Sequence, residues 1–157
     1  MMRYMIYETN TPEVDLAQEL KYIHNYLDLQ QLQYDNPNLV SYTLEGSPDN
    51  IRVAPMLFIA FIENAFKHGI SPTEPSFIDI TLTEKDDEIH CVIRNSNYPK
   101  NAMDKSGSGI GLEQVRKRLE LLYAGRYEWH QQISSNQKEY SSILTIKIPD
   151  NNKKILP

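Results

Sequence analysis

The sequence lacks several features that would place it in a specialised class of protein. It has a single cysteine, Cys91, so an internal disulfide framework is excluded. No apolar run reaches the roughly 18 residues of a transmembrane helix, and Met1 to Asn10 lacks the basic start and apolar core of a signal peptide. Long Lys/Arg runs are absent and the formal net charge is -5, which disfavours nucleic-acid binding and membrane contact. Any bound anion must therefore be held by a local arrangement of groups.

Internal repeats and low-complexity tracts are also absent from the 157 residues. This length suits one domain, or one domain with a helical extension. Apolar residues make up 40% and charged residues 24%, which is enough for one hydrophobic core. Cys91 lies in an apolar alternating run, so we expect a buried small side chain and not a reactive thiol. The chain is expected to be soluble and intracellular, and any membrane anchor of its parent lies outside it.

The first predicted element is a helix from about Asp15 to Tyr34. Asp15 is a preferred N-cap residue, and Gln18 would complete a capping box. Side chains at spacings of 4, 3, 4, 3 and 4 form a seam of Leu16, Leu20, Ile23, Leu27, Gln30 and Tyr34. This pattern is typical of a helix that packs on another helix in coiled-coil fashion.

The rest of the chain is predicted to mix strands and helices. Alternating apolar residues favour strands at 40–44, 78–82, 89–93, 127–134 and 140–148, with a hairpin turn at 85–88. Helices are expected at 55–68, with Pro55 at the first position and Gly69 just past the end, and at 110–123. The aperiodic segment 95–109 is long enough to be a functional loop, such as a lid. This order predicts an α+β fold in which helices cover one face of a mixed sheet.

The helix at 55–68 ends in a cluster of polar side chains. Residues 56–62 are apolar nearly all round, as in a buried helix. At about 100° per residue, Glu63, Asn64, Lys67 and His68 then fall within about 140° of one another. Burying these groups without partners is costly, so we expect a polar ligand opposite them. The alternative is an i,i+4 pair of Glu63 and Lys67 on a solvated face.

A glycine-rich run precedes the next helix. Gly107, Gly109 and Gly111 alternate before it, so backbone N–H groups and the helix start can approach a phosphate closely. The run fits neither the Rossmann fingerprint nor a Walker A loop. Alone it is equally consistent with a flexible loop and a helix cap, but combined with the polar helix face it indicates a nucleotide site.

These two features together resemble the N-box and G2-box of the ATPase domain shared by histidine kinases, gyrase, the Hsp90 chaperones and MutL. More closely, residues 3–148 resemble LytS-type sensor histidine kinases. The matching runs are Glu19–Ile23, Tyr26–Gln30, Pro55–Gly69, Gly109–Leu112, Val115–Leu119 and Leu122–Tyr123. The resemblance implies a two-layer α/β sandwich of the Bergerat (GHKL) type with an N-terminal helix. It also implies three segments: part of the dimerisation and phosphotransfer helical region (1–36), an ATP-binding catalytic domain (37–149) and a polar tail (150–157).

The resemblance also implies the roles of the polar helix residues. Asn64 would hold the Mg²⁺ that bridges the ATP phosphates, a task that suits an amide oxygen. Glu63 would orient Mg²⁺ or its water, so both residues are catalytic candidates. Lys67 and His68 would contact phosphate oxygens. Such parts supply the positioning and charge neutralisation that phosphoryl transfer needs.

The remaining implied contacts come from later in the chain. Gly107, Gly109, Gly111 and Leu112 would bind the phosphates, and 97–108 would close over the nucleotide. Most of the wider superfamily has an Asp that accepts a hydrogen bond from the adenine amino group. Asn95 stands at that position, and its uncharged amide oxygen would accept a weaker bond.

Two further departures bear on the activity. ATP-hydrolysing members of the superfamily carry a Glu four residues before the N-box Asn, where this chain has Ala60, which favours a kinase over an autonomous ATPase. The Asn-Pro-His-Phe run that holds the phosphoacceptor in the kinases is missing. His24 lies on the first helix but has different neighbours, so a surface histidine is the simpler interpretation. The first helix would then be the remaining half of a dimerisation hairpin.

The leading hypothesis is therefore the catalytic domain of a sensor histidine kinase that uses ATP and Mg²⁺. Its expected partners are the phosphoacceptor helix of its parent, a response regulator and a second copy in the parent dimer. The parent would be anchored in the inner membrane with this domain in the cytoplasm. The alternatives are a nucleotide-binding or dimerisation module without catalysis, and a serine kinase or chaperone-type ATPase of the same fold. Residues 116–118 are interpreted as a solvated face, with Arg116 or Arg118 near the phosphates as the alternative, and Trp129, Tyr123 and Tyr127 as core or rim.

Overall fold

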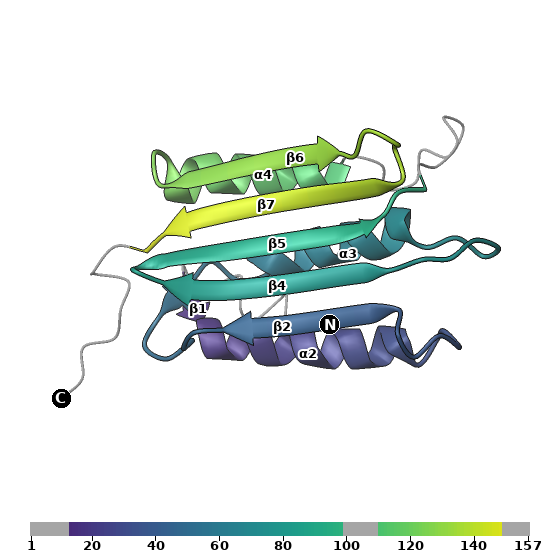
Figure 1. The fold of residues 1–157 in the computed structure, drawn as a ribbon. Helices are drawn as coiled ribbons and strands as arrows, with labels where there is room; N and C mark the ends of the chain where they lie inside the picture. Colours follow the sequence, from purple (N-terminus) through teal and green to yellow (C-terminus); the bar gives the residue numbers. More distant parts are fainter. Residues whose placement is uncertain (1–12, 99–109, 149–157) are drawn as a thin grey trace.

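The structure, a computed structural model, describes residues 13–98 and 110–148. Its helices are α2 (Leu16–Gln31), α3 (Leu57–Gly69) and α4 (Ile110–Tyr123), and its longer strands are β2 (Val40–Glu45), β4 (Ile78–Lys85), β5 (Glu88–Ser96), β6 (Tyr127–Ile133) and β7 (Glu139–Lys147). The five strands form one sheet in the order β2-β4-β5-β7-β6. β2 pairs with β4 in parallel and the other pairs are antiparallel. The predicted mixed sheet is confirmed, and the helices lie on one of its faces (Figure 1).

A second, two-stranded sheet joins β1 (Val14–Asp15) to β3 (Arg52–Val53). The sequence does not predict it, because two residues are too few to show an alternation. Arg52 strengthens the pairing: one guanidinium nitrogen donates to Asp15 Oδ1 at 3.1 Å and the other to the carbonyl of Glu13 at 2.6 Å. The pair ties the start of α2 to the segment that leads into α3.

The hairpin between β4 and β5 has the predicted position. Lys85 faces Glu88 in the register, so the loop consists of Asp86 and Asp87. Both have positive φ, 54° and 63°, as the two central residues of a type I′ turn require, and Asp tolerates that region. The register then places Ile80 opposite Ile93 on the face that the helices cover.

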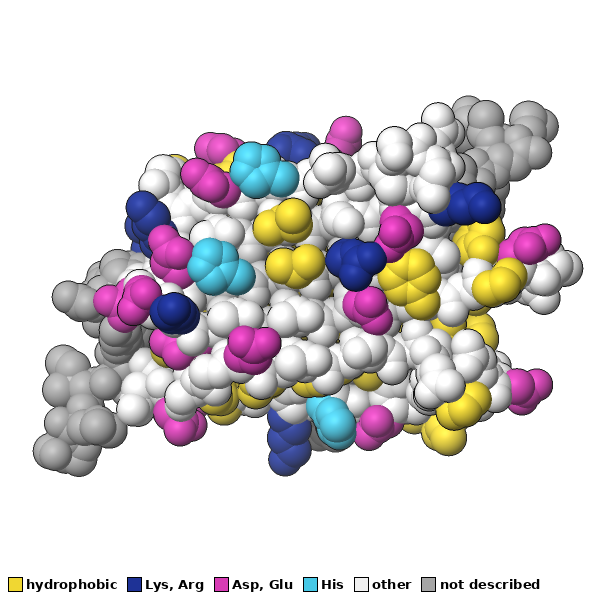
Figure 2. All heavy atoms as spheres, viewed as in Figure 1, with side chains coloured by type: hydrophobic (Ala, Val, Ile, Leu, Met, Phe, Trp, Pro, Cys, Tyr) yellow, Lys and Arg dark blue, Asp and Glu magenta, His cyan; other side chains and the backbone are white. Residues whose placement is uncertain are grey.

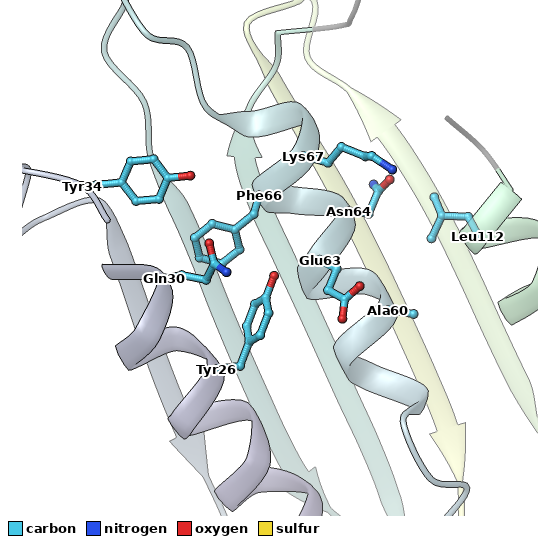
Figure 3. Close-up of a pocket in the computed structure, with 9 residues that line it drawn as sticks. All are labelled: Tyr26, Gln30, Tyr34, Ala60, Glu63, Asn64, Phe66, Lys67 and Leu112. Carbon is cyan, nitrogen blue, oxygen red and sulfur yellow. The ribbon is translucent and has the colours of Figure 1, made fainter. Parts of the chain in front are cut away.

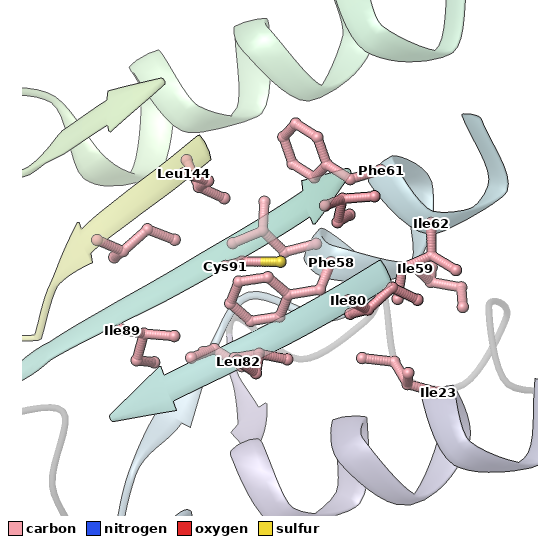
Figure 4. Close-up of a cluster of buried hydrophobic side chains, with 14 of the residues drawn as sticks. Ile23, Phe58, Ile59, Phe61, Ile62, Ile80, Leu82, Ile89, Cys91 and Leu144 are labelled. Atoms are coloured by element: carbon pink, nitrogen blue, oxygen red, sulfur yellow. The ribbon is translucent and has the colours of Figure 1, made fainter. Parts of the chain in front are cut away.

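The core lies between the sheet and the helices (Figure 4). Its fully buried members come from every layer and include Ile23, Phe58, Ile62, Ile80, Leu82, Ile89, Cys91 and Leu144. Each such side chain contributes roughly 1.5–3 kcal/mol relative to exposure. The prediction that Cys91 is buried is confirmed, since 1% of it is exposed.

The apolar seam of α2 has a different partner from the predicted one. Leu16, Leu20, Ile23 and Leu27 are buried in the core of this chain, so this face packs within the domain and not along a helix of a hairpin. The expected capping box is also wrong, because the side chain of Asp15 makes no capping hydrogen bond and pairs with Arg52. The proposed boundary between residues 36 and 37 stays a prediction.

The start of α3 was predicted two residues too early. The helix begins at Leu57, and its N-cap Met56 has left-handed backbone angles, φ 62° and ψ 19°. Pro55 therefore precedes the cap and is not the first helical residue. At the other end, Gly69 is the last residue of the helix, and Ile70 is extended. The cause is tertiary, because hydrogen bonds with side chains of α2 and α4 hold residues 54–56. The local sequence around these residues gives no indication of such bonds.

The face of the sheet away from the helices carries mixed polar side chains. Figure 2 shows acidic, basic and histidine side chains scattered over it. Arg94 pairs there with Asp79 at 3.7 Å and with Glu139 at 2.5 Å, and His90 lies 3.1 Å from Glu88. Because positive and negative side chains are interspersed, this face has no electrostatic potential of a single sign.

Candidate functional site

The polar end of α3 opens into a cavity of about 390 Å³. Nine residues line it: Tyr26, Gln30, Tyr34, Ala60, Glu63, Asn64, Phe66, Lys67 and Leu112. Figure 3 shows side chains from α2, α3 and α4 that point into this space. The volume is within the range of small-ligand pockets. The structure thus brings together Glu63, Asn64, Lys67 and Leu112, four of the residues that the sequence predicted for the site.

The helix geometry orders these side chains around α3. At about 100° per residue, Phe66 faces α2, Glu63 comes next, and Asn64 faces α4. Lys67 and Ala60 lie between Glu63 and Asn64. Leu112 stands in the first turn of α4, opposite Asn64 and Lys67 in Figure 3. The glycine-rich run directly precedes Leu112 in the sequence, so it leads into the α4 side of the cavity.

The end of α3 is fixed against strand β5 by a close backbone approach. A Cβ added at Gly69 would lie 3.0 Å from both Cβ and Nδ2 of Asn95 and 3.2 Å from the carbonyl oxygen of Ser96. In addition, the hydroxyl of Ser96 donates to the carbonyl of Gly69. Glycine at this position therefore sets how closely the polar end of the helix sits on the sheet.

Helix α2 and the segment that follows it supply a wall of the cavity that the sequence did not predict for the site. Tyr26, Gln30 and Tyr34 recur every fourth residue and line it. The ring of Tyr26 contacts Phe66 edge-on, at a centroid distance of 5.7 Å and an interplanar angle of 81°. The available signal was the polar and aromatic stripe at i, i+4 and i+8, whose last two members, Gln30 and Tyr34, are also the end of the predicted seam.

Electrostatic effects connect the two sides of the cavity. Partial burial raises the pKa of Glu63, and the nearby Lys67 opposes that shift. The two side chains of the alternative i,i+4 pair therefore influence each other electrostatically, and both line the cavity. Burial raises the pKa of Tyr26 strongly, with a further contribution from the Glu63 carboxylate.

Other predicted site residues lie elsewhere. His68 does not line the cavity, and its carbonyl accepts a hydrogen bond from the N–H of Tyr98 at 2.9 Å. Asn95 was predicted in the loop but belongs to β5, and 1% of it is exposed. Gly107 and Gly109 lie outside the described residues, and Gly111 is in the first turn of α4.

The amide of Asn95 is only half satisfied within the described part of the chain. Its Nδ2 donates to the carbonyl of Ser96 at 2.8 Å, whereas its buried Oδ1 has no hydrogen-bond partner there. A buried acceptor of this kind costs about 1–3 kcal/mol. The atom is thus available to a donor that lies outside the described residues.

The basic residues after the glycine-rich run have structural contacts. The guanidinium of Arg116 lies 4.3 Å from the ring centroid of Trp129, and Arg118 donates to the carbonyl of Pro55 at 2.6 Å. Lys117 is exposed. Tyr123 is buried and accepts a hydrogen bond from the N–H of Ala54. Hence neither arginine lines the cavity, and Arg118 does not belong to a solvated face.

Histidine and carboxylate side chains form no metal-binding group in residues 13–98 and 110–148. His24 is largely exposed and lies 3.5 Å from Asp28, one turn away, as a surface histidine would. On the α3 side of the cavity, the amide of Asn64 and the carboxylate of Glu63 could offer oxygen atoms to a hard cation.

Comparison with known proteins finds histidine kinases. Residues 1–38 match the histidine kinase family. The sensor histidine kinase YpdA of Escherichia coli (strain K12) is 27% identical over 131 residues, which cover 78% of this chain and 23% of that protein. The sensor protein kinase HptS of Staphylococcus aureus is 25% identical over 163 residues, or 95% of this chain and 30% of that protein. The chain thus spans less than a third of these relatives.

Solved structures show the same fold. The catalytic domain of the histidine kinase ThkA superposes with a TM-score of 0.58 at 17% identity, over 86% of this chain and 93% of that chain. ThkA in complex with the response regulator TrrA gives 0.57 at 16% identity, over 90% and 42%. The predicted fold is therefore confirmed as that of histidine kinase catalytic domains. Within the described residues, the helices are too short or too polar to cross a membrane.

Proposed function

We propose that this chain is the ATP-binding catalytic part of a sensor histidine kinase, which transfers the γ-phosphoryl group of ATP to a histidine outside this sequence. One observation carries the proposal: Asn64 and Lys67 from α3 meet Leu112 from α4 at one cavity, directly after the glycine-rich run. An amide, an ammonium and glycine N–H groups are what a bound triphosphate needs for neutralisation and positioning. The kinship with sensor histidine kinases supports the same function.

The donor set fits Mg²⁺ brought by a nucleotide. Mg²⁺ is usually held by one or two protein oxygens, with phosphates and waters completing its shell. Asn64 would hold it through the amide oxygen, and Glu63 would orient its water. When bound, the ion neutralises charge on the phosphates, while Lys67 contributes a fixed positive charge beside them.

The base would be recognised by Asn95. Its buried Oδ1 has no partner within the described residues, so the amino group of adenine would satisfy an acceptor that is otherwise costly to bury. His68 would contact phosphate oxygens beside Lys67. The backbone at Gly107, Gly109 and Gly111 would complete the phosphate contacts.

The position of Ala60 supports transfer to an acceptor over hydrolysis. Ala60 lines the cavity one helical turn before Asn64, and a methyl group cannot activate a water molecule. The position one turn before Asn64 would therefore supply no general base for water. The histidine that accepts the phosphoryl group would lie on a helix of the parent kinase and would pass the group to a response regulator. The parent would be a dimeric, membrane-anchored kinase of the LytS type, with this domain on the cytoplasmic side.

Calorimetry with Mg²⁺ and a non-hydrolysable ATP analogue tests the nucleotide site. We expect binding that Asn64→Ala weakens about tenfold or more and that the exposed control Asn38→Ala leaves unchanged. The absence of heat at about 1 mM analogue would refute the ATP site. Transfer is tested by mixing the chain with a separately produced acceptor helix and labelled ATP. The measurement is the acid-labile label on the helix, because phosphohistidine is acid-labile.

A non-catalytic nucleotide-binding or dimerisation module is the second candidate. It is favoured by the missing Asn-Pro-His-Phe run and by Asn95 in place of Asp. Nucleotide binding without any transfer to the acceptor helix would select this candidate.

A further inference from the structure

The cavity at the end of α3 has two sides of different charge, and the proposed function mainly uses one of them. In Figure 3, the ammonium of Lys67 and the amide of Asn64 point toward Leu112 on α4. The carboxylate of Glu63 projects from α3 nearer to the wall that α2 and the following segment provide. That wall contributes no cation to the lining of the cavity. The side toward α2 therefore carries a net negative charge.

Four polar side chains gather on this negative side. We call them the acceptor cluster, and all of them line the cavity: Glu63, Tyr26, Gln30 and Tyr34. In the described part of the chain, their side chains form no hydrogen bond and no ion pair. Lys67 influences Glu63 electrostatically without pairing with it. Because these groups converge on one space and leave their hydrogen-bonding capacity unused, they are available to a ligand.

The chemistry of the acceptor cluster restricts the ligand that it fits. An ionised carboxylate only accepts hydrogen bonds, an amide oxygen accepts them, and a phenol oxygen accepts as well as donates. A fitting ligand therefore brings several N–H donors. It also brings a positive charge, because a hydrogen bond to Glu63 from a cation is stronger than one from a neutral donor.

Aromatic rings stand beside these acceptors. The rings of Tyr26 and Phe66 meet edge-on, with a centroid distance of 5.7 Å and an interplanar angle of 81°. Tyr34 lies near enough to Tyr26 to contribute to its raised pKa, after burial and Glu63. The face of an aromatic ring attracts a cation, and a planar guanidinium can stack on it while its N–H groups donate in the plane. A compact ammonium has no plane to stack, so the site favours a guanidinium.

We propose that the acceptor cluster binds a guanidinium group, carried by an arginine side chain of a partner protein or by a small guanidino compound. The N–H groups of the ligand donate to the carboxylate of Glu63 and to the amide oxygen of Gln30. Its plane lies against the ring of Tyr26. The site goes beyond the proposed function, because it takes a second ligand on the side of Glu63 opposite Asn64. The two carboxylate oxygens of Glu63 allow this residue to serve both sides of the cavity.

Titrations without nucleotide test this site separately from the ATP site. The probes are blocked tripeptides that differ only in the central residue, which is arginine, lysine or citrulline, the neutral isostere of arginine. Ethylguanidinium chloride is the fourth probe. Binding is followed by NMR through the backbone amides of α2 and α3. Gln30→Leu removes one acceptor, Tyr26→Phe removes a hydroxyl and keeps the ring, and Gln33→Leu is the matched control at an exposed position outside the cavity.

We expect the arginine peptide to bind with a Kd of about 1–10 mM, and the lysine and citrulline peptides to bind at least about fivefold more weakly. Gln30→Leu and Tyr26→Phe should each weaken the arginine peptide about threefold or more, while Gln33→Leu matches the wild type. Tighter binding of the peptide than of ethylguanidinium assigns the ligand to a protein side chain, and the reverse assigns it to a small molecule.

Three results would overturn the site: equal binding of the arginine and citrulline peptides, equal binding by Gln30→Leu and Gln33→Leu, or no saturable shift at about 50 mM peptide. A lysine peptide that binds as well as the arginine peptide would overturn the assignment to a guanidinium. Because nucleotide is absent from these titrations, failure of the ATP site would leave their result unchanged.

Discussion

The buried carboxylate of Glu19 on α2 accepts a hydrogen bond from the backbone N–H of Met56 at 3.0 Å. Met56 is the left-handed residue from which α3 starts. The two residues before it are also held from outside, since Arg118 donates to the carbonyl of Pro55 and Ala54 donates to Tyr123. Helices α2 and α4 therefore fix the start of the helix that carries Asn64.

Replacing Glu19 by Ala should destabilise the fold by about 1–3 kcal/mol, because the buried N–H of Met56 loses its acceptor. Glu19→Gln keeps an oxygen acceptor and should cost less. The free energy of unfolding from urea titration measures both, with Lys21→Ala on the exposed side of α2 as the control. Equal stability of Glu19→Ala and the control would show that the bond contributes nothing.

Gly69→Ala should destabilise the domain by about 1–3 kcal/mol, since its Cβ would meet Asn95 at 3.0 Å and the backbone of β5 cannot yield easily. It should also weaken binding of the ATP analogue, because Asn95 must shift. The control is Gly125→Ala, where φ is +75° but nothing lies within 4 Å of the added Cβ. That variant should lose stability through backbone strain alone and bind the analogue normally. Calorimetry would contradict the prediction if both variants bound equally.

Stability should fall above pH 9 because of Cys91. Burial raises the pKa of its thiol from 9.0 to about 12, so the thiolate forms first in the unfolded chain. The contribution of the neutral thiol is complete below pH 9 and is lost as the pH rises toward 12, at up to about 1.4 kcal/mol per pH unit. Urea titrations between pH 8 and pH 10 should show this slope in the wild type and a flatter one in Cys91→Ala. Parallel profiles would assign the loss to the buried tyrosines.

Arg116→Ala should destabilise the domain by about 0.5–1 kcal/mol, because the guanidinium covers the ring of Trp129 at 4.3 Å. Trp129 also contacts Phe61 on α3 edge-on at 5.1 Å, so the stack connects α4, β6 and α3. Lys117→Ala, on the neighbouring exposed position of α4, should be neutral. Thermal unfolding followed by tryptophan fluorescence checks both, and an equal shift of the two variants would count against the cation–π contact.

Periodicity predicted most of the fold correctly, and the exceptions have physical causes. The strands around Ile80 and Ile93 and the helix at 110–123 were recognisable because burial on one face leaves a regular pattern in the sequence. The two-residue strands β1 and β3 leave none. The start of α3 was misplaced because Glu19 stabilises a left-handed Met56, which costs energy locally and is repaid by a contact distant in sequence.

The candidate site was predicted in part for similar reasons. Glu63, Asn64 and Lys67 stand on one helix, so their spacing alone places them together. Tyr26 and Gln30 belong to another helix, and their approach to α3 depends on how the apolar seam of α2 packs into the core. Asn95 was identified by its place at the end of a strand, but the buried Oδ1 without a partner among the described residues, which supports its role, is visible only in the tertiary structure.

By itself, the sequence determined the fold class and the polar end of α3, because these depend on local spacing and residue chemistry. The tertiary structure decided which residues face them. It turned the seam of α2 inward, brought Tyr26 and Gln30 to the side of Glu63 opposite Asn64, and fixed the start of α3 between Glu19 and Arg118. These relationships join residues far apart in the chain, and only the packing of the helices on the sheet brings them within bonding distance.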